Sequence, residues 1–407
     1  MLFERERVSM LSRFTYRSTF YACSSAFVVG AVINNLPSLF FVIFQDWFGV
    51  SYAQISLLVT VHFLTQLIVD AICAGFIHQL RWRTCICVSC FFSFAGLLLL
   101  GIIPQITHTY LFLFIPIITF AIGSGLADVI VNPIIENIPG DDQAGKMSMA
   151  HSFYSWGLVV VIILTTITLR IVGHARWYWI PIAWSLLPFA NFGLFLVIPI
   201  CEIKEKQGII PYKKIVSSRM FILALILMLC AGACEMTVSQ WSSLFAEKAL
   251  GMPKVVGDIA GPCLFACAMG CGRVIFGVLG KRMQMVNVLL SCSFLCIFAY
   301  SLMALSPRTG ASLFGCMLCG FAVSVLWPGM LSLAAFRFPG GGATMFAFLA
   351  FSGDIGCSMG PGLAGIVSDK LVARGWSASS SLRGGLLTCI LFSFLMIGSL
   401  CIWKNKK

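Results

Sequence analysis

Charged residues are scarce in this 407-residue chain, where Asp, Glu, Lys and Arg together make up 10% of the positions. A soluble globular domain is about a quarter charged, so the composition argues against one. Hydrophobic residues make up 59% of the chain, and the mean hydropathy is +0.96. The apolar runs are roughly 20 or more residues long and lack strand-like alternation, as membrane-spanning helices do. The sequence therefore predicts an all-α integral membrane protein.

Signatures of catalysis and of metal binding are also missing. Among the 18 Cys, the pairs Cys87–Cys90 and Cys316–Cys319 have a metal-like spacing, but they lie inside apolar runs and lack His partners. They are better explained as small apolar helix residues, and such free use of thiols argues against an oxidising compartment. The sequence shows no convergent nucleophile and base and no nucleotide fingerprint. We expect no enzymatic activity, no metal and no cofactor.

Basic residues are distributed as membrane orientation requires. The chain has 27 Lys and Arg against 15 Asp and Glu, but no basic domain outside the spans that would suit a nucleic acid. If the N-terminus is inside, 18 of these basic residues flank the cytoplasmic side and 8 flank the other, with Arg273 inside a span. We expect a multi-pass protein of the plasma (inner) membrane with both termini in the cytoplasm and no nucleic-acid partner.

Twelve apolar spans form two sets of six. In round figures they are 20–44, 54–77, 84–103, 109–137, 146–171 and 177–201, followed by 219–246, 255–279, 285–305, 309–336, 341–368 and 383–403. We predict an N-terminal six-helix bundle over 1–201, a cytoplasmic linker loop over 202–218 and a C-terminal six-helix bundle over 219–407. The two halves echo each other in Gly and Pro. The echoes are Gly30/Gly232, Gly49/Gly251 and Gly75/Gly277, displaced by 202, and Gly125/Gly320 and Pro133/Pro328, displaced by 195. They indicate a parallel duplication, the plan of a two-bundle transporter.

The fourth span carries polar residues at helical spacing. Asp128, Asn132 and Glu136 follow one another at intervals of four and so lie near one stripe of the helix. A charge at bilayer depth costs about 2.5–3.5 kcal/mol, so such residues are expected to face a cavity or a partner. Asp128 is a candidate for carrying a proton or binding a substrate; the alternative is a structural hydrogen bond to another helix. Glu136 is closer to water and is expected at a gate.

Two other spans carry similar stripes. In the second span, Gln66 is a candidate for lining a path, and Asp70 for fastening helices or a gate; His62 is expected to be packed. In the seventh span, Glu235 precedes Gln240 and Trp241. A ring beside amide and carboxyl groups suits a sugar, because its apolar face stacks while its hydroxyls find hydrogen-bond partners. The alternative is that Trp241 only anchors at the interface.

The remaining candidates lie in three other spans. Asn34 and Asn35, in the first span, add amides to the same cavity. Arg273 and Asp354 are candidates for charge pairs that hold one conformation. Whether these two pair with each other cannot be read from the sequence.

Several of these motifs resemble the major facilitator superfamily, in particular its sugar:proton symporter branch that includes fucose and glucose/mannose permeases. The similar motifs are Asp128 four positions before Asn132-Pro133, Glu235 six before Trp241, His151-Ser-Phe153-Tyr154 opening the fifth span, and Gly353-Asp354 in the eleventh. The resemblance implies cation-coupled sugar uptake with Asp128 in the proton step. It also makes Tyr154 a substrate candidate and His151 a gating or helix-pairing candidate. The chain departs from the superfamily at Gln79, where an Asp is expected.

These inferences predict a secondary active transporter of the major facilitator fold, with twelve helices in two bundles, that imports a sugar or similar small polar solute with protons by alternating access. The proton would be carried by Asp128. The substrate-binding candidates are Asn34, Asn35, Gln66, Asn132, Tyr154, Glu235, Gln240 and Trp241. The gating or helix-pairing candidates are Asp70, Glu136, His151, Arg273 and Asp354. The alternatives are transport or export of a non-sugar solute, or a transport-dead receptor. We expect a monomer whose partners are the solute, protons and the lipid bilayer.

Overall fold

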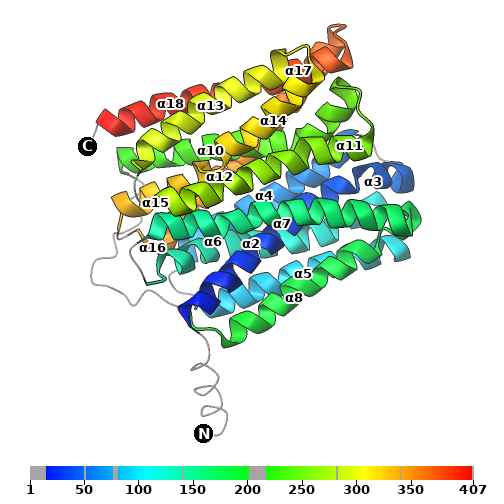
Figure 1. Ribbon diagram of the computed structural model, residues 1–407. Helices are drawn as coiled ribbons and strands as arrows, with labels where there is room; N and C mark the ends of the chain where they lie inside the picture. The colour runs from blue at the N-terminus through cyan, green and yellow to red at the C-terminus, as the bar shows by residue number, and fades with distance from the viewer. Residues whose placement is uncertain are drawn as a thin grey trace. The chain divides into compact units, whose positions relative to one another are not determined.

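The computed structural model describes residues 15–49, 52–76, 81–139, 142–200, 217–280, 283–339 and 341–405. The described residues form helices and no strands (Figure 1). The chain divides into two compact units. Unit 1 comprises residues 1–157, 164–209 and 340–348, and unit 2 comprises residues 158–163, 210–339 and 349–407. The boundaries of the two bundles remain a prediction. Most of the predicted linker lies outside the described residues, and so does Gln79.

Unit 1 holds the first six predicted spans. Its elements are α2 (Tyr16–Leu39), the short α3 (Phe41–Phe48), α4 (Tyr52–Phe76), α5 (Trp82–Ile106), the 3-10 helix η2 (Tyr110–Leu113), α6 (Phe114–Glu136), most of α7 (Gln143–Val172), the 3-10 helix η3 (His174–Arg176) and α8 (Trp179–Val197). Helix α6 packs against α5, α4 and α2, and α8 packs against α5 and α2. The helix that carries Asp128 is therefore surrounded by three others of its own unit.

Unit 2 holds the last six predicted spans. Its elements are α10 (Arg219–Leu244), the π-helix η4 (Phe245–Ala249), α11 (Lys254–Asp258), the π-helix η5 (Ile259–Cys263), α12 (Leu264–Leu279), α13 (Met285–Leu305), α14 (Thr309–Val323), α15 (Leu326–Arg337), most of α16 (Gly342–Ala373), α17 (Ala378–Leu387) and α18 (Ile390–Asn405). Helix α14 packs against α13 and α12, and α10 packs against α18 and α15.

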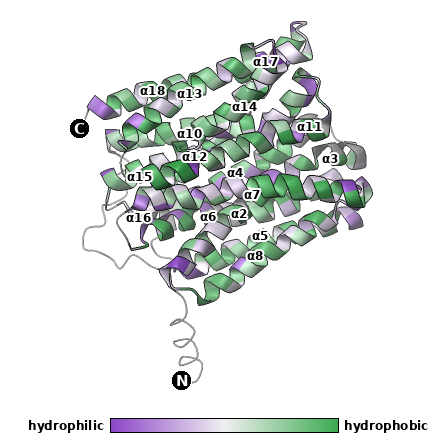
Figure 2. Ribbon diagram, in the orientation of Figure 1, coloured by the Kyte–Doolittle hydropathy of each residue, from purple (hydrophilic) through white to green (hydrophobic). Residues whose placement is uncertain are grey.

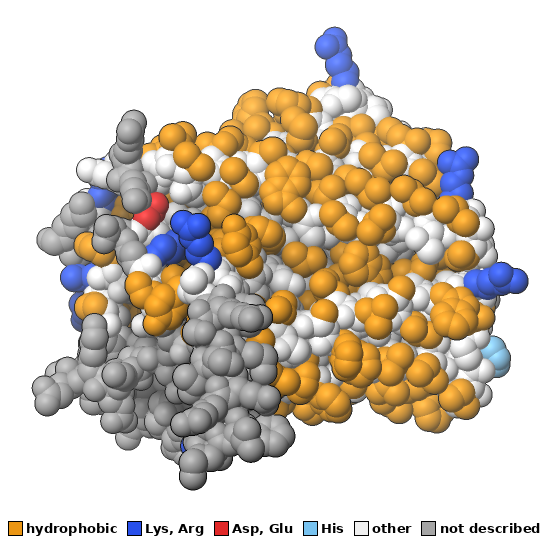
Figure 3. Space-filling model, turned by 60° about the horizontal axis from the view of Figure 1, so that its bottom comes forward, with side chains coloured by type: hydrophobic (Ala, Val, Ile, Leu, Met, Phe, Trp, Pro, Cys, Tyr) orange, Lys and Arg blue, Asp and Glu red, His pale blue; other side chains and the backbone are white. Residues whose placement is uncertain are grey.

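Ten of the described helical segments are long and apolar enough to cross a membrane. Helices α4 and α16 lie outside those ten, so the exact number of twelve remains a prediction. Hydrophobic residues run along most helices (Figure 2), and hydrophobic side chains cover much of the molecular face drawn in Figure 3, with Lys and Arg toward its edges. Exposed side chains such as Ile171, at 77%, and Leu391, at 63%, suit a lipid environment. The structure is that of a multi-pass membrane protein.

Two of the glycine echoes occupy equivalent places in the two units. Gly49 and Gly251 both have a positive φ, of 63° and 70°, which only glycine adopts without strain. Gly125 of α6 lies against Val69 of α4, and Gly320 of α14 lies against Phe265 of α12, where a Cβ would be 2.1 Å from the Phe265 carbonyl oxygen. In each unit, glycine therefore brings the fourth helical span onto the second, as expected of a duplication.

Arginine caps a helix end in both units. Arg83, at the start of α5, donates to the carbonyl oxygens of Phe195, Leu196 and Ile198 at the end of α8, at 2.6–2.9 Å. In unit 2, Arg383 of α17 donates to the carbonyls at the end of α13, among them Ser306 at 2.7 Å. The last carbonyls of a helix have no intrahelical partner, so each guanidinium satisfies groups that lipid could not.

Candidate functional site

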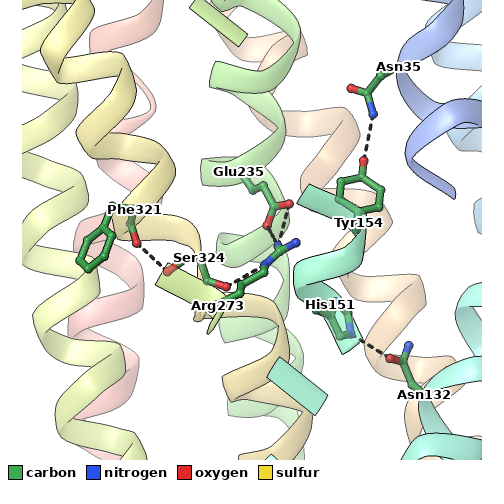
Figure 4. Close-up of polar contacts among 8 residues, drawn as sticks. All are labelled: Asn35, Asn132, His151, Tyr154, Glu235, Arg273, Phe321 and Ser324. Atoms are coloured by element: carbon green, nitrogen blue, oxygen red, sulfur yellow. Dashed lines mark hydrogen bonds and ion pairs between the residues drawn. The ribbon is translucent and has the colours of Figure 1, made fainter. Parts of the chain in front are cut away.

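Asp128 lies on α6, is partly buried, and has no described hydrogen-bond or ion-pair partner for its carboxylate. One turn later, the Asn132 side chain donates from Nδ2 to the Asp128 carbonyl oxygen at 2.7 Å. Its other amide atom, Oδ1, lies 3.0 Å from Nε2 of His151 on α7 (Figure 4). The predicted Asp128–Asn132 stripe is therefore linked to His151 through the amide of Asn132.

These contacts determine that Nε2 of the His151 ring carries a proton. An amide oxygen only accepts hydrogen bonds, so His151 must carry a proton on Nε2 to donate to Asn132. The ring is 7% exposed and packs against Phe27 of α2, with the ring centroids 4.3 Å apart. His151 thus orients the Asn132 amide within unit 1, a positioning contact that no spacing in the sequence reveals.

Two further polar pairs tie α2 to its neighbours in unit 1. His62 Nε2 of α4 lies 3.0 Å from Oδ1 of Asn34, so the His62 ring also donates from Nε2. Asn35 donates from Nδ2 to the hydroxyl of Tyr154 on α7 at 3.2 Å, and to the Ala31 carbonyl at 3.0 Å (Figure 4). Both amides of the predicted Asn34–Asn35 pair are therefore engaged, each with a different helix.

Two further polar residues of unit 1, Gln66 and Asp70, are deeply buried, whereas Glu136 is partly exposed. Gln66 is 1% exposed, and neither of its amide atoms has a hydrogen-bond partner among the described residues. Such an unsatisfied buried amide is costly, which makes Gln66 a candidate for binding a polar group. Asp70 is fully buried on α4. Glu136 is the last residue of α6, in keeping with its expected place near the span's end.

In unit 2, Glu235 and Arg273 form a buried ion pair (Figure 4). Nη2 of Arg273 on α12 lies 3.0 Å from each carboxylate oxygen of Glu235 on α10. The side chains are 9% and 2% exposed. The Arg273 Nε donates to the Ser324 carbonyl oxygen at 2.9 Å. The sequence left the partner of Arg273 open; the structure identifies it as Glu235.

The remaining unit 2 candidates do not converge on this pair by any described contact. The Gln240 Nε2 lies 3.5 Å from the Met236 sulfur. Trp241 packs over Gly365 of α16, where a Cβ would be 3.1 Å from the indole ring. Asp354 is 6% exposed on α16. Glu235 is thus held by Arg273, whereas Trp241 lies one and a half turns away, against a glycine.

Sequence reasoning missed two residues, a buried amide in unit 1 and a partly exposed aromatic residue in unit 2. Asn191 of α8 is 1% exposed, both its amide atoms lack partners among the described residues, and it lines a cavity of about 10 Å³ within unit 1, beside Ser124 of α6. That volume is about the size of one water molecule. Trp327 of α15 is the only partly exposed residue between positions 322 and 334. Asn191 had the same signal as Asn132, an amide inside an apolar span.

Comparison with known proteins places this arrangement in a family. The family model of the Major Facilitator Superfamily matches residues 10–361. The chain belongs to the major facilitator superfamily. Membership indicates a membrane transporter rather than a catalyst of chemical reactions, as the sequence predicted. A search among curated proteins gives no match.

Solved structures of superfamily members share the fold. The transporter FucP in its outward conformation has a TM-score of 0.75 and 15% identity, with 94% of this chain and 98% of that chain covered. A second FucP structure, of a variant of the E. coli fucose:proton symporter, has a TM-score of 0.73, 16% identity and the same coverage. The proton:xylose symporter XylE, bound to 6-bromo-6-deoxy-D-glucose, has a TM-score of 0.77 and 10% identity, with 97% of this chain and 96% of that chain covered. At these identities, the likeness shows the fold alone.

Proposed function

We propose that this superfamily member imports a sugar or similar neutral polar solute together with protons, by alternating access, across the plasma membrane with both termini in the cytoplasm. The observation that supports this most is Asp128, an acid inside an apolar span whose carboxylate has no described partner. A charged carboxylate without a partner is costly at that depth, so binding a proton would let the loaded carrier reorient. The names of the structural neighbours, both proton symporters for sugars, support the same solute class.

The amides and rings of unit 1 suit a polyhydroxylated solute. Asn132, Gln66 and Tyr154 supply donors and acceptors to hydroxyl groups, and His151 fixes the orientation of the first of them. In unit 2, Arg273 neutralises Glu235, so the pair presents no net charge. An ion pair without net charge offers no uncompensated partner in unit 2 to a sugar acid or a phosphate, so it favours neutral solutes.

Uptake into vesicles tests the proposal. Wild-type protein should accumulate a labelled neutral monosaccharide when a membrane potential that draws protons inward is imposed, and a protonophore should abolish the accumulation. With one proton per solute, a membrane potential of 100 mV supplies about 2.3 kcal/mol, which sustains a ratio of about 50-fold. Asp128→Asn should lower this ratio to about one while preserving exchange.

Other outcomes would redirect the proposal. Accumulation that survives the protonophore would overturn proton coupling. Accumulation of other polar solutes but of no sugar in a labelled panel would leave a proton-coupled carrier with a different cargo. Transport in the outward direction only would indicate export.

A further inference from the structure

The tenth span contains an interruption that a proline explains. Helix α14 ends at Val323, Ser324 and Val325 form a turn, and α15 begins at Leu326. In a continuous helix, the Ser324 carbonyl would accept a hydrogen bond from the N–H of residue 328. That residue is Pro328, which has no N–H, so the carbonyl loses its intrahelical partner. Inside a membrane no water is at hand to replace it.

Arg273 supplies the missing donor. Its Nε lies 2.9 Å from the Ser324 carbonyl oxygen, and Arg273 is 1% exposed. The preceding residue, Gly272, allows α12 to approach the turn, because a Cβ there would be 2.3 Å from the Ser324 hydroxyl oxygen. The guanidinium is positively charged and buried, and Glu235 of α10 forms an ion pair with it. Arg273 of α12 thus links the end of α14 to Glu235 of α10.

Unit 1 shows that a proline at this position does not by itself interrupt the helix. Pro133 occupies the position in α6 that corresponds to Pro328, displaced by 195. Helix α6 nevertheless continues from Phe114 to Glu136. The interruption and its arginine therefore distinguish unit 2 from unit 1.

Trp327 lies beside the turn that Arg273 bridges. It is three residues after Ser324 and directly before Pro328, and it is the only partly exposed residue between 322 and 334. Its indole ring packs over Gly353 of α16, where a Cβ would lie 2.4 Å from the ring. Trp327 is the second residue of α15, so the direction of its ring follows from how the turn at Ser324 and Val325 starts that helix. An aromatic face of this kind can stack on the apolar face of a sugar.

We propose that Arg273 is a positioning residue that replaces the backbone donor missing at Pro328, and thereby fixes the turn that presents Trp327 to a neutral polar solute. The second half of this inference rests on the proposed function, whereas the first half concerns the fold of unit 2 alone. Glu235 acts in this arrangement as the counter-ion of Arg273.

A rescue experiment tests the inference. The double variant Glu235→Leu/Arg273→Leu removes both charges and leaves the Ser324 carbonyl without a donor. We expect a lower thermal midpoint in detergent and an apparent KM for the solute raised about two- to tenfold, the worth of one aromatic contact, with a smaller change in the maximal rate. Adding Pro328→Ala restores an N–H at position 328 and should recover both the midpoint and the KM. A triple variant that does not recover would overturn the inference.

Two further variants separate positioning from general packing. Pro133→Ala, the matched change in unit 1, should not rescue the double variant; rescue by it would also overturn the inference. Arg273→Lys keeps the charge beside Glu235 but loses Nε, so it should lower the midpoint in the wild-type background and be tolerated with Pro328→Ala. If it lowers the midpoint equally in both backgrounds, Arg273 is not replacing the Pro328 donor.

Unfolding and transport report on different parts of this inference. Thermal midpoints are measured without a solute. If the effect of a substitution at position 273 on the midpoint does not depend on the residue at position 328, the inference is contradicted, whether or not transport occurs. A wild-type protein that transports no sugar, with that coupling intact, contradicts the proposed function only. If substitutions at positions 273 and 328 are coupled in the thermal midpoint but replacing Arg273 does not change the KM, the role of Trp327 is overturned.

Discussion

Replacing Gly96 should separate the helix that carries Asp128 from its neighbour. Gly96 of α5 faces Phe120 of α6. Phe120 lies about two turns before Asp128 on the same helix. A Cβ added at Gly96 would lie 2.4 Å from the Phe120 backbone nitrogen, 2.6 Å from its Cβ and 2.8 Å from its Cα. Ordinary van der Waals contact begins at 3.4 Å, so the two helices must move apart by about 1 Å. Backbone atoms cannot rotate away as a side chain can.

The expected magnitude follows from two opposing effects. Overpacking of this kind costs typically about 1–3 kcal/mol. The gain from replacing a helical glycine with alanine is about 0.5–1 kcal/mol. We therefore expect Gly96→Ala to destabilise the protein by about 1 kcal/mol, and by about 2.5 kcal/mol at most. Transport should fall as well, because α6 carries Asp128 and Asn132.

Gly193 of α8 provides the matched control. It lies inside a helix, and a Cβ there would have no atom within 4 Å. Gly193→Ala should thus be neutral or slightly stabilising. Unfolding can be followed in detergent with a thiol-reactive dye, because most of the described cysteines are buried and free. Equal thermal midpoints for the two variants would refute the packing argument.

Three further substitutions test other contacts. Glu235→Gln leaves Arg273 buried without its counter-ion and should destabilise the protein by about 3–5 kcal/mol in equilibrium unfolding. An unchanged free energy of unfolding would show that the two charges are not paired in the protein interior. His151→Phe removes the donor to Asn132 and should raise the apparent KM for the solute without uncoupling it from protons, measured as uptake with and without a protonophore. Arg83→Ala uncaps the end of α8 and should cost about 1.5–3 kcal/mol, the worth of a hydrogen bond to a charged group, measured by thermal unfolding.

Local spacing in the sequence anticipated much of unit 1. The interval of four between Asp128 and Asn132 placed them one turn apart on a helix, and the structure shows their backbone–side-chain contact at 2.7 Å. The glycine echoes predicted equivalent places in two halves, and Gly49 and Gly251 share a positive φ. Such features depend on helical periodicity and on backbone conformation, which short stretches of sequence determine.

Contacts between distant segments could not be predicted in the same way. Glu235 and Arg273 are 38 residues apart on different helices, and Arg273 had an equally plausible partner in Asp354. Likewise, nothing in the spacing pairs Asn35 with Tyr154, 119 residues away. The bond between Arg273 and the Ser324 carbonyl requires knowing both that the helix is interrupted before Pro328 and which helix packs beside it. These facts belong to the tertiary structure.

Solute-driven proton movement tests the central claim most directly. Vesicles that contain the purified protein, with no imposed pH gradient, would receive a neutral sugar on one side while the external pH is recorded. We predict that protons enter with the sugar in the wild type and that Asp128→Asn abolishes this proton entry. Sugar entry through the wild-type protein without any proton movement, or undiminished proton entry in Asp128→Asn, would contradict the claim.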